Sequence, residues 1–212
     1  MKTVLVTGGT TRLGSFIAGR LRAEGWQVLT SSHRPDAGAD FTADLADPMG
    51  PARLYAAVMA RLGGMPPDAL VNNAALYTGD ADVLERIGFE APKKLTMMMA
   101  GRETGRGAVV NILDTRVLGE PDAEGDGPGY VRAKRRLLDY TRSSAALYGE
   151  TLTVNGVAPG PVLAPTGVHE LAGELVSVRP TPEEIAAAVS FLLGAPSVTG
   201  TVIPVDGGQH LL

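Results

Sequence analysis

The amino-acid sequence predicts an α/β fold, in which a doubly wound parallel sheet carries helices on both faces. Short apolar runs rich in β-branched residues alternate with longer helical stretches along the chain. Most of these runs are continuously apolar, as expected for parallel strands that are buried on both faces. A glycine-rich turn joins the first apolar run to the first helical stretch, a connection that is typical of this fold class.

The strands expected from these patterns cover residues 3–7, 27–30, 69–72, 108–113, 151–157 and 201–205. Helical patterns cover residues 13–24, 51–62, 130–148 and 181–193, and residues 80–101 have an irregular helical pattern. The last helix has the clearest beginning, because a capping threonine, Thr181, precedes a proline and two glutamates. A further strand is expected just before Asp44. The segments 122–129 and 159–167 are rich in glycine and proline and are expected to be surface loops.

Length and composition predict one globular domain that spans residues 1–212. A chain of 212 residues, with 44% hydrophobic and 20% charged residues, can bury a substantial core. No internal repeat is visible in the sequence. A single folded unit is therefore expected.

Charge and composition exclude several classes of protein. The net charge of −4 and the absence of a basic run argue against a nucleic-acid partner. No apolar stretch approaches the roughly 20 residues that span a bilayer, and residues 2–7 form a strand pattern rather than a signal peptide. The chain has no cysteine, which excludes disulfides and thiolate chemistry, and no metal site is expected. We therefore expect a cytoplasmic protein that acts on a small molecule and has no membrane partner.

The turn GGTTRLGS, residues 8–15, links the first strand to the first helix. Such a turn leaves backbone N–H groups at the positive end of the helix, where a phosphate binds. The spacing of Gly8 and Gly14 alone describes a structural turn equally well. Its position after the first strand of an alternating chain favours a nucleotide site.

Arg12 occupies a place in this turn where a third glycine is common. After the second strand, Ser32, His33 and Arg34 stand where an acid would bind the ribose 2′-hydroxyl of NAD. A cation beside hydroxyl donors fits a 2′-phosphate, so the two arginines predict NADP(H) as the cofactor. The competing interpretation places both arginines on the solvated surface. Two residues after the next strand are expected at the adenine end of the cofactor, Asp44 and Leu45.

Tyr130 and Lys134 lie one turn apart at the start of the helix expected over residues 130–148, so their side chains share a face. A nearby ammonium group favours the phenolate and lowers the pKa of a tyrosine, which makes the tyrosine usable for acid–base chemistry near neutrality. A tyrosine–lysine pair at this spacing is usually an exposed helix contact. Its meaning therefore depends on the motifs around it.

Taken together, these motifs resemble the short-chain dehydrogenase/reductase family over nearly all of the chain. The matching positions are Thr7, Gly8, Arg12, Leu13 and Gly14, then Asn72, Asn73 and Ala74, Tyr130 and Lys134, Asn155, Gly156, Pro159 and Gly160, and finally residues 198–200 and 205–208. The resemblance implies a Rossmann fold and hydride transfer that depends on NAD(P). It implies that Tyr130 donates a proton, while Lys134 holds the ribose and tunes the phenol. The implied cofactor site consists of Gly8, Thr11, Arg12, Leu13, Asn73, Ala74, Tyr130, Lys134, Pro159, Gly160 and Val162.

One departure from the family pattern is typical of a subgroup. Asp114 follows the strand at the place where the family usually has its catalytic serine. Together, this aspartate and the arginines in the turn and after the second strand form a pattern that resembles the pteridine reductases and the dihydromonapterin or dihydrofolate reductases. The C-terminal residues 206–211 are also similar to the dihydromonapterin enzymes. The resemblance implies a catalytic set of Asp114, Tyr130 and Lys134, and a pterin-type substrate bound by Arg12, Tyr77, Asp114 and Tyr130, with Tyr77 covering the ring opposite the nicotinamide.

Other interpretations stay open. Tyr77 also fits an ordinary loop aromatic, and Asp114 an acid at a strand end. Ala75 stands where the pteridine enzymes tend to have a hydroxyl. Glu90 stands where the family has a catalytic asparagine, and a glutamate there could still accept hydrogen bonds from the water network around Lys134. A ketone or 3-oxoacyl reductase of the same family is the nearest alternative. A non-catalytic NADP(H)-binding or sensing protein is another, favoured by Glu90 and by the short loops.

The resemblance also implies self-association. Family members commonly pair the helix before the fifth strand and the helix that carries Tyr130. The first of these contains Leu95, Met97, Met98 and Met99, whose adaptable apolar side chains suit an interface and also suit a core. We expect a homodimer or homotetramer.

Overall fold

A computed structural model describes residues 1–103, 105–119, 129–162 and 179–212. Its centre is a sheet of seven strands in the order β3-β2-β1-β4-β5-β6-β7, and all neighbouring strands run parallel. The order reverses between β1 and β4, as in a doubly wound sheet, which confirms the predicted fold class. The strands are β1 (Thr3–Thr7), β2 (Gln27–Ser32), β3 (Phe41–Thr42), β4 (Ala69–Asn72), β5 (Gly107–Ile112), β6 (Leu152–Pro159) and β7 (Val202–Val205).

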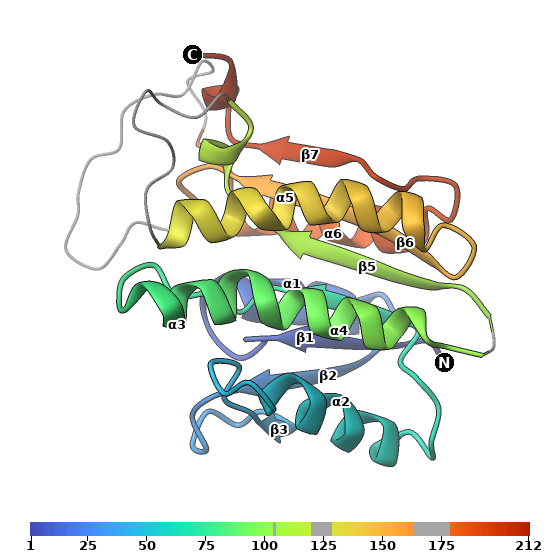
Figure 1. Ribbon diagram of the computed structural model, residues 1–212. Coiled ribbons are helices and arrows are strands. Elements are labelled where there is room, and N and C mark those ends of the chain that lie inside the picture. Colours follow the sequence, from blue (N-terminus) through green and yellow to red (C-terminus); the bar gives the residue numbers. More distant parts are fainter. Residues whose placement is uncertain (104, 120–128, 163–178) are drawn as a thin grey trace.

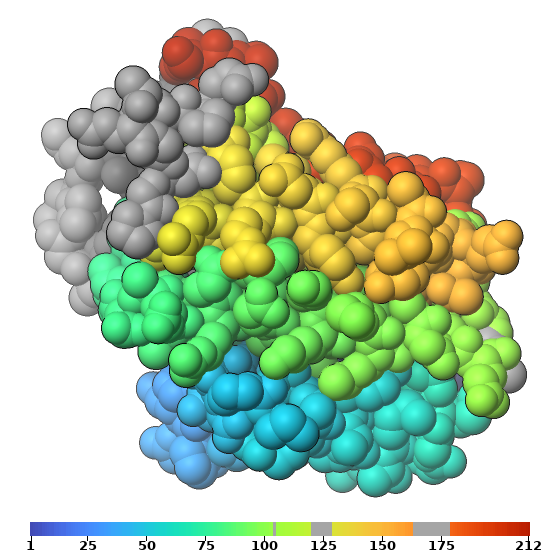
Figure 2. All heavy atoms as spheres, viewed as in Figure 1, coloured from blue at the N-terminus to red at the C-terminus, as the bar shows by residue number. Residues whose placement is uncertain are grey.

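Helices cover both faces of this sheet (Figure 1). On one face, Ile17 and Leu21 pack with Val189 against the strands. On the other face, Leu54 and Leu95 belong to a second core cluster, and the helices above it form the surface seen in Figure 2. The first face carries α1 (Arg12–Ala23) and α6 (Pro182–Gly194), and the second carries α2 (Gly50–Arg61), α4 (Ala91–Ala100) and α5 (Tyr130–Leu147).

Most predicted elements are confirmed, with small shifts at their ends. β1 and β4 coincide with the expected ranges, while β2 and β6 continue beyond them to Ser32 and Pro159. The expected start of α6 is a complete capping box: the Thr181 N–H donates to Glu184 at 2.7 Å, and the Glu184 N–H donates to the Thr181 hydroxyl at 3.3 Å. The expected loops 122–129 and 159–167 lie mostly outside the described residues. Within the described part of the chain, none of the helices combines the length and apolar character needed to cross a bilayer.

The irregular segment consists of three consecutive helical pieces. α3 (Ala81–Glu85) begins at Asp80, whose carboxylate accepts the N–H groups of Asp82 and Val83. A π-helical turn, η1 (Arg86–Glu90), then leads into α4. Pro92 stands at the start of α4 and has no N–H to give to the preceding turn, which permits the wider winding there.

Two residues expected at a subunit interface lie in the core instead. Leu95 and Met99 are fully buried, because they lie on the side of α4 that faces the sheet. Their assignment to an interface was wrong. Met97 points outward with 49% of its surface exposed, and Met98 is half-buried. Only these two methionines of the helix remain available for a partner.

A buried polar chain connects the centre of the sheet to α5. Asn72 in β4 donates from Nδ2 to Oδ1 of Asn111 in β5 at 2.8 Å, and Asn111 donates to the Thr141 hydroxyl of α5 at 2.9 Å. Buried amides of this kind are costly unless they are paired, so the chain fixes how α5 lies on β5. The middle of α5 is thereby held against β5.

Candidate active site

The turn between β1 and α1 is built for close approach. Gly8 has a φ of 63°, in the left-handed region, and a side chain at Gly14 would begin 2.0 Å from the carbonyl oxygen of Gly8. The side-chain amide of Asn73 donates to the carbonyls of Thr7 and Gly8 at 2.9 and 3.1 Å, which ties the turn to the end of β4. These contacts define the shape of the turn.

The N-terminus of α1 has the features of an anion site. Thr11 is the N-cap but makes no side-chain capping bond, and the first turn contains no acidic residue. Arg12 follows with a φ of 48°, which is a strained conformation for a residue with a side chain. Its side chain is exposed at the sheet edge, and Leu13 packs partly into the core.

The residues predicted to bind the adenosine half follow β2 and β3. Ser32 ends β2, and its hydroxyl accepts the N–H of Arg34 at 3.1 Å, while His33 and Arg34 are exposed. Asp44 is exposed. Leu45 is different, because its side chain is buried in the core below the sheet. The predicted contact of this side chain with an adenine is therefore wrong, because the side chain packs into the core.

The remaining predicted cofactor residues follow β4 and β6 at the same edge of the sheet. The Thr7 hydroxyl accepts the N–H groups of Asn73 and Ala74 at 3.0 and 3.1 Å. Pro159 ends β6, and Gly160 and Val162 continue from it. Because all strands are parallel, their carboxyl ends converge on one side, and the predicted set is brought together there.

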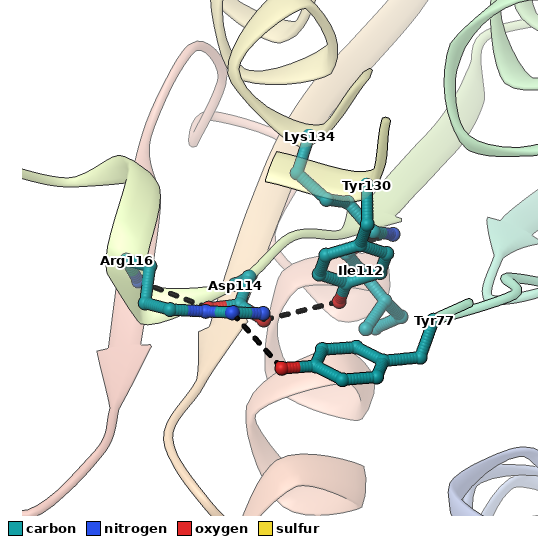
Figure 3. Close-up of polar contacts among 6 residues, drawn as sticks. All are labelled: Tyr77, Ile112, Asp114, Arg116, Tyr130 and Lys134. Carbon is teal, nitrogen blue, oxygen red and sulfur yellow. Dashed lines mark hydrogen bonds and ion pairs between the residues drawn. The ribbon is translucent and has the colours of Figure 1, made fainter. Parts of the chain in front are cut away.

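Tyr130 and Asp114 meet beside this edge, as expected from the sequence (Figure 3). The hydroxyl of Tyr130, the first residue of α5, donates to Oδ2 of Asp114 at 3.0 Å. The ring of Tyr77 lies against the ring of Tyr130, with 5.2 Å between centroids and an angle of 60°. Tyr77 is 60% exposed, so much of this residue is accessible to a ligand.

Lys134 lies one turn further along α5 and is 2% exposed. Its Nζ donates to the carbonyl oxygen of Ile112 at 2.5 Å and lies 5.7 Å from the centre of the Tyr130 ring. Burial lowers the pKa of Lys134 to about 8, with the charge of Asp114 acting in the opposite direction. The hydrogen bond to β5 thus holds the lysine close to the ring of Tyr130.

Arg116 is a site residue that the sequence interpretation missed. Its guanidinium donates from Nε and Nη2 to the two oxygens of Asp114, at 3.0 and 2.9 Å, and from Nη1 to the Tyr77 hydroxyl at 3.2 Å (Figure 3). Its central carbon lies 5.3 Å from the ring centres of both Tyr77 and Tyr130. The signal in the sequence is the spacing Asp-x-Arg after β5, which places Asp114 at the N-cap of the short turn η2 (Thr115–Val117) and Arg116 within it.

The electrostatics of the site correct one expectation. Burial acts to raise the pKa of Asp114, but the hydrogen bonds and charge of Arg116, with the Tyr130 hydroxyl, hold it below its ordinary value. Burial raises the pKa of Tyr130, and the Asp114 carboxylate raises it further. The expected lowering of the Tyr130 pKa is therefore wrong, because burial and the Asp114 carboxylate raise it.

Glu90 has a different partner from the one expected. Its carboxylate lies 3.7 Å from Nη2 of Arg136 on α5, and Arg136 also pairs with Glu85. Glu90 therefore belongs to an ion-pair cluster between η1 and α5. Ala75 is exposed in the loop that follows β4.

Comparison with known proteins decides the family. The family model described as enoyl-(acyl carrier protein) reductase matches residues 11–210. Levodione reductase of Leifsonia aquatica is 31% identical, in an alignment that covers 98% of this chain and 94% of that protein. The chain belongs to the short-chain dehydrogenase/reductase family.

Two further relatives have names that point to different substrates. The crystal structure of FolM alternative dihydrofolate reductase 1 from Brucella canis, complexed with NADP, has a TM-score of 0.82 and 28% identity, over 100% of this chain and 95% of that chain. The 3-oxoacyl-[acyl-carrier-protein] reductase MabA of Mycobacterium bovis is 28% identical over 99% of this chain and 93% of that protein. Membership of the family confirms an oxidoreductase that uses a nicotinamide cofactor.

Proposed function

We propose that this protein uses NADPH to reduce a C=N bond of a pterin-type ring, such as a dihydropterin or a dihydrofolate-like compound. The observation that carries the proposal is the ionised carboxylate of Asp114 beside the Tyr130 hydroxyl, next to the open ring of Tyr77. The similarity to FolM alternative dihydrofolate reductase 1 supports the same substrate class.

The residues present fit NADP(H). The close-packed turn at Gly14 and the N-terminus of α1, which lacks a side-chain cap, suit a pyrophosphate. Arg12 and Arg34 are both exposed at the edge where the adenosine ribose would lie, and a guanidinium suits a 2′-phosphate. When bound, NADPH supplies the hydride. Lys134, beneath the tyrosine, would hold the nicotinamide ribose.

The protein's own residues provide the proton. A C=N bond that accepts a hydride at carbon needs a proton at nitrogen. Tyr130 keeps its proton because its pKa is raised, and it lies at the centre of the site, so we assign it as the donor. The positive charge of Lys134, 5.7 Å from the ring, offsets the phenolate that remains.

Asp114 distinguishes a pterin from a ketone. An ionised carboxylate accepts hydrogen bonds and has no proton to donate. A pterin ring presents N–H groups that such a carboxylate binds. The oxygen of a ketone needs donors, and its developing negative charge is repelled by Asp114. This contrast favours the pterin over the 3-oxoacyl substrate of MabA, although the match to the enoyl-reductase model keeps acyl substrates as the second candidate.

The test is a substrate panel with the intact protein. NADPH oxidation is followed with a dihydropterin, dihydrofolate, a 3-oxoacyl thioester and a simple ketone, and Tyr130→Phe serves as the inactive control. We expect saturable turnover with the pterins alone. Turnover with the 3-oxoacyl thioester alone would assign the second candidate, and tight NADPH binding without turnover on the whole panel would assign a sensing role.

A further inference from the structure

Arg116 makes three hydrogen bonds to the Asp114 carboxylate. Oδ1 of Asp114 accepts from Nε of Arg116 at 3.0 Å and from the Arg116 backbone N–H at 3.0 Å. Oδ2 accepts from Nη2 of Arg116 at 2.9 Å and from the Tyr130 hydroxyl at 3.0 Å. Two carboxylate oxygens have about four acceptor positions between them. Among the described residues, Arg116 occupies three of these positions and Tyr130 the fourth.

The position held by Tyr130 is the one that a substrate can take. The three bonds from Arg116 come from one residue, two of them in a bidentate pair, and they are charge-assisted. The bond from Tyr130 comes from a neutral hydroxyl that rotates about its own axis. An N–H group of a substrate therefore displaces Tyr130 more easily than Arg116. The displaced hydroxyl is then free to donate to the substrate.

The same guanidinium holds the aromatic wall of the site. Nη1 of Arg116 donates to the Tyr77 hydroxyl at 3.2 Å, and the rings of Tyr77 and Tyr130 both lie 5.3 Å from the guanidinium carbon. Tyr77 follows β4, Arg116 follows β5, and Tyr130 begins α5. One side chain thus connects three separate segments of the chain.

The turn that carries Arg116 is itself fixed from its other side. The hydroxyl of Thr115 donates to the carboxylate of Asp206, which is 3% exposed. Asp206 also accepts the N–H groups of Gly208 and His210, at 2.9 and 3.0 Å, and the ring nitrogen of His210 lies 2.8 Å away. Among the residues that the structure describes, the titratable groups around Asp114 are thus Arg116 on its own turn, Tyr130 and Lys134 on α5 and Tyr77 after β4, with Asp206 and His210 behind Thr115.

We propose that Arg116 is the positioning residue of this site: it fills the acceptor positions of Asp114 except the one that Tyr130 holds, so that the site selects a ring in which an N–H donor lies next to the bond to be reduced. The selection of the ring rests on the proposed function, whereas the positioning of Asp114 does not. Ketones and acyl thioesters lack such a donor and leave the Tyr130–Asp114 bond intact.

The positioning is tested without a substrate. The carboxyl carbons of aspartate are labelled with ¹³C in the full-length protein, the Asp114 signal is assigned with Asp114→Asn, and its titration is followed by NMR. We expect Asp114 to titrate at higher pH in Arg116→Met than in the parent, with Arg116→Lys in between, because the guanidinium favours the ionised form. Arg61→Met, at the exposed end of α2, is the matched control and should leave the titration unchanged. An unchanged Asp114 titration in Arg116→Met would overturn the proposal.

The selection is tested by kinetics on the same variants. We expect kcat/KM for the dihydropterin to fall roughly tenfold or more in Arg116→Met, with its acid limb moved to higher pH and the Kd for NADPH unchanged. Added guanidinium ions should restore part of the activity of Arg116→Ala and none of that of Asp114→Asn. A fall in activity while the acid limb stays in place would reduce Arg116 to a packing role and contradict the inference. If the parent protein turns over no pterin, the proposed function fails, and the titration still decides the role of Arg116.

Discussion

The Tyr130 hydroxyl donates to Oδ2 of Asp114 at 3.0 Å, across the space between the first turn of α5 and the end of β5. Burial and the carboxylate together raise the pKa of the phenol, while Arg116 keeps the carboxylate ionised against the effect of its own burial. The pair therefore has one proton, and it is on the tyrosine. This arrangement suits a tyrosine that acts as a general acid, because it keeps its proton until the substrate binds.

Tyr130→Phe should remove most of the turnover and leave NADPH binding intact. The change deletes the proton donor and its hydrogen bond to Asp114, and it keeps the ring against Tyr77. General acid catalysis of this kind contributes about a hundredfold or more to the rate. Steady-state kinetics and an NADPH titration check both parts. Tyr140→Phe, on the same helix, is the control, and undiminished turnover in Tyr130→Phe would remove this tyrosine from the mechanism.

Lys134 should give the stability of the cofactor-free protein a distinct pH dependence. Burial lowers its pKa to about 8, whereas an unfolded lysine titrates near about 10.4. Between these values the unfolded chain binds more protons, so the free energy of unfolding should rise with pH, by up to about 1.4 kcal/mol per pH unit. Urea denaturation of the parent and of Lys134→Met from pH 7 to 10 (roughly the span of the two pKa values) isolates this contribution. If the difference in unfolding free energy between the two proteins does not change with pH, folding does not lower the pKa of Lys134.

Lys134→Met should also weaken both NADPH binding and turnover. The ammonium group is the proposed partner of the nicotinamide ribose and offsets charge on the Tyr130 ring. Separate measurement of Kd and of single-turnover rates distinguishes this result from that of Tyr130→Phe. A Kd equal to that of the parent would take the lysine out of the cofactor site.

The parent protein should prefer NADPH to NADH because of Arg12 and Arg34. Charge-assisted contacts with a phosphate are worth about 1.5–3 kcal/mol each, so Arg34→Asp should weaken NADPH binding more than tenfold. Binding of NADH should change much less, since it has no 2′-phosphate. Arg61→Asp makes the same charge change at a distant exposed position and serves as the control. Equal affinities of the parent for both cofactors would end this assignment.

Asp114→Ser should change the choice of substrate. It removes the carboxylate that binds an N–H donor and introduces a hydroxyl that donates to a carbonyl oxygen. We expect loss of pterin reduction and retained or increased activity on simple ketones. The decisive quantity is the ratio of the two activities in the variant and in the parent. If both activities move together, Asp114 does not determine specificity.

The protein should be a homodimer or homotetramer that uses the outward methionines of α4. Met97 is 49% exposed beside the half-buried Met98, and such side chains adapt to a partner surface. Light scattering at micromolar concentration should give a multiple of the chain mass, and Met97→Glu should reduce it. Met65→Glu changes another exposed methionine away from α4 and should leave the mass unchanged. A monomeric parent would contradict the prediction.

Local patterns were enough to predict the elements of the fold and much of the site. The apolar runs predicted both ends of β1 and β4, and the capping residues predicted the start of α6. These signals depend only on near neighbours in the chain. The glycine turn, and Tyr130 with Lys134, were found for the same reason. In a parallel sheet, the loops that follow the strands all lie at the same edge, so the location of the site could be predicted from the strands alone.

Tertiary structure alone decided the remaining points, since each depends on which segments meet in space. Met97 and Met99 have the same chemistry, and only the packing of α4 on the sheet makes one exposed and the other buried. Glu90 was paired with Arg136 by the contact between η1 and α5. The pKa of Tyr130 rises rather than falls because burial and the nearby Asp114 carboxylate both raise it. The role of Arg116 was missed because it depends on three segments, those after β4 and β5 and the start of α5, that meet around its guanidinium only in the folded protein.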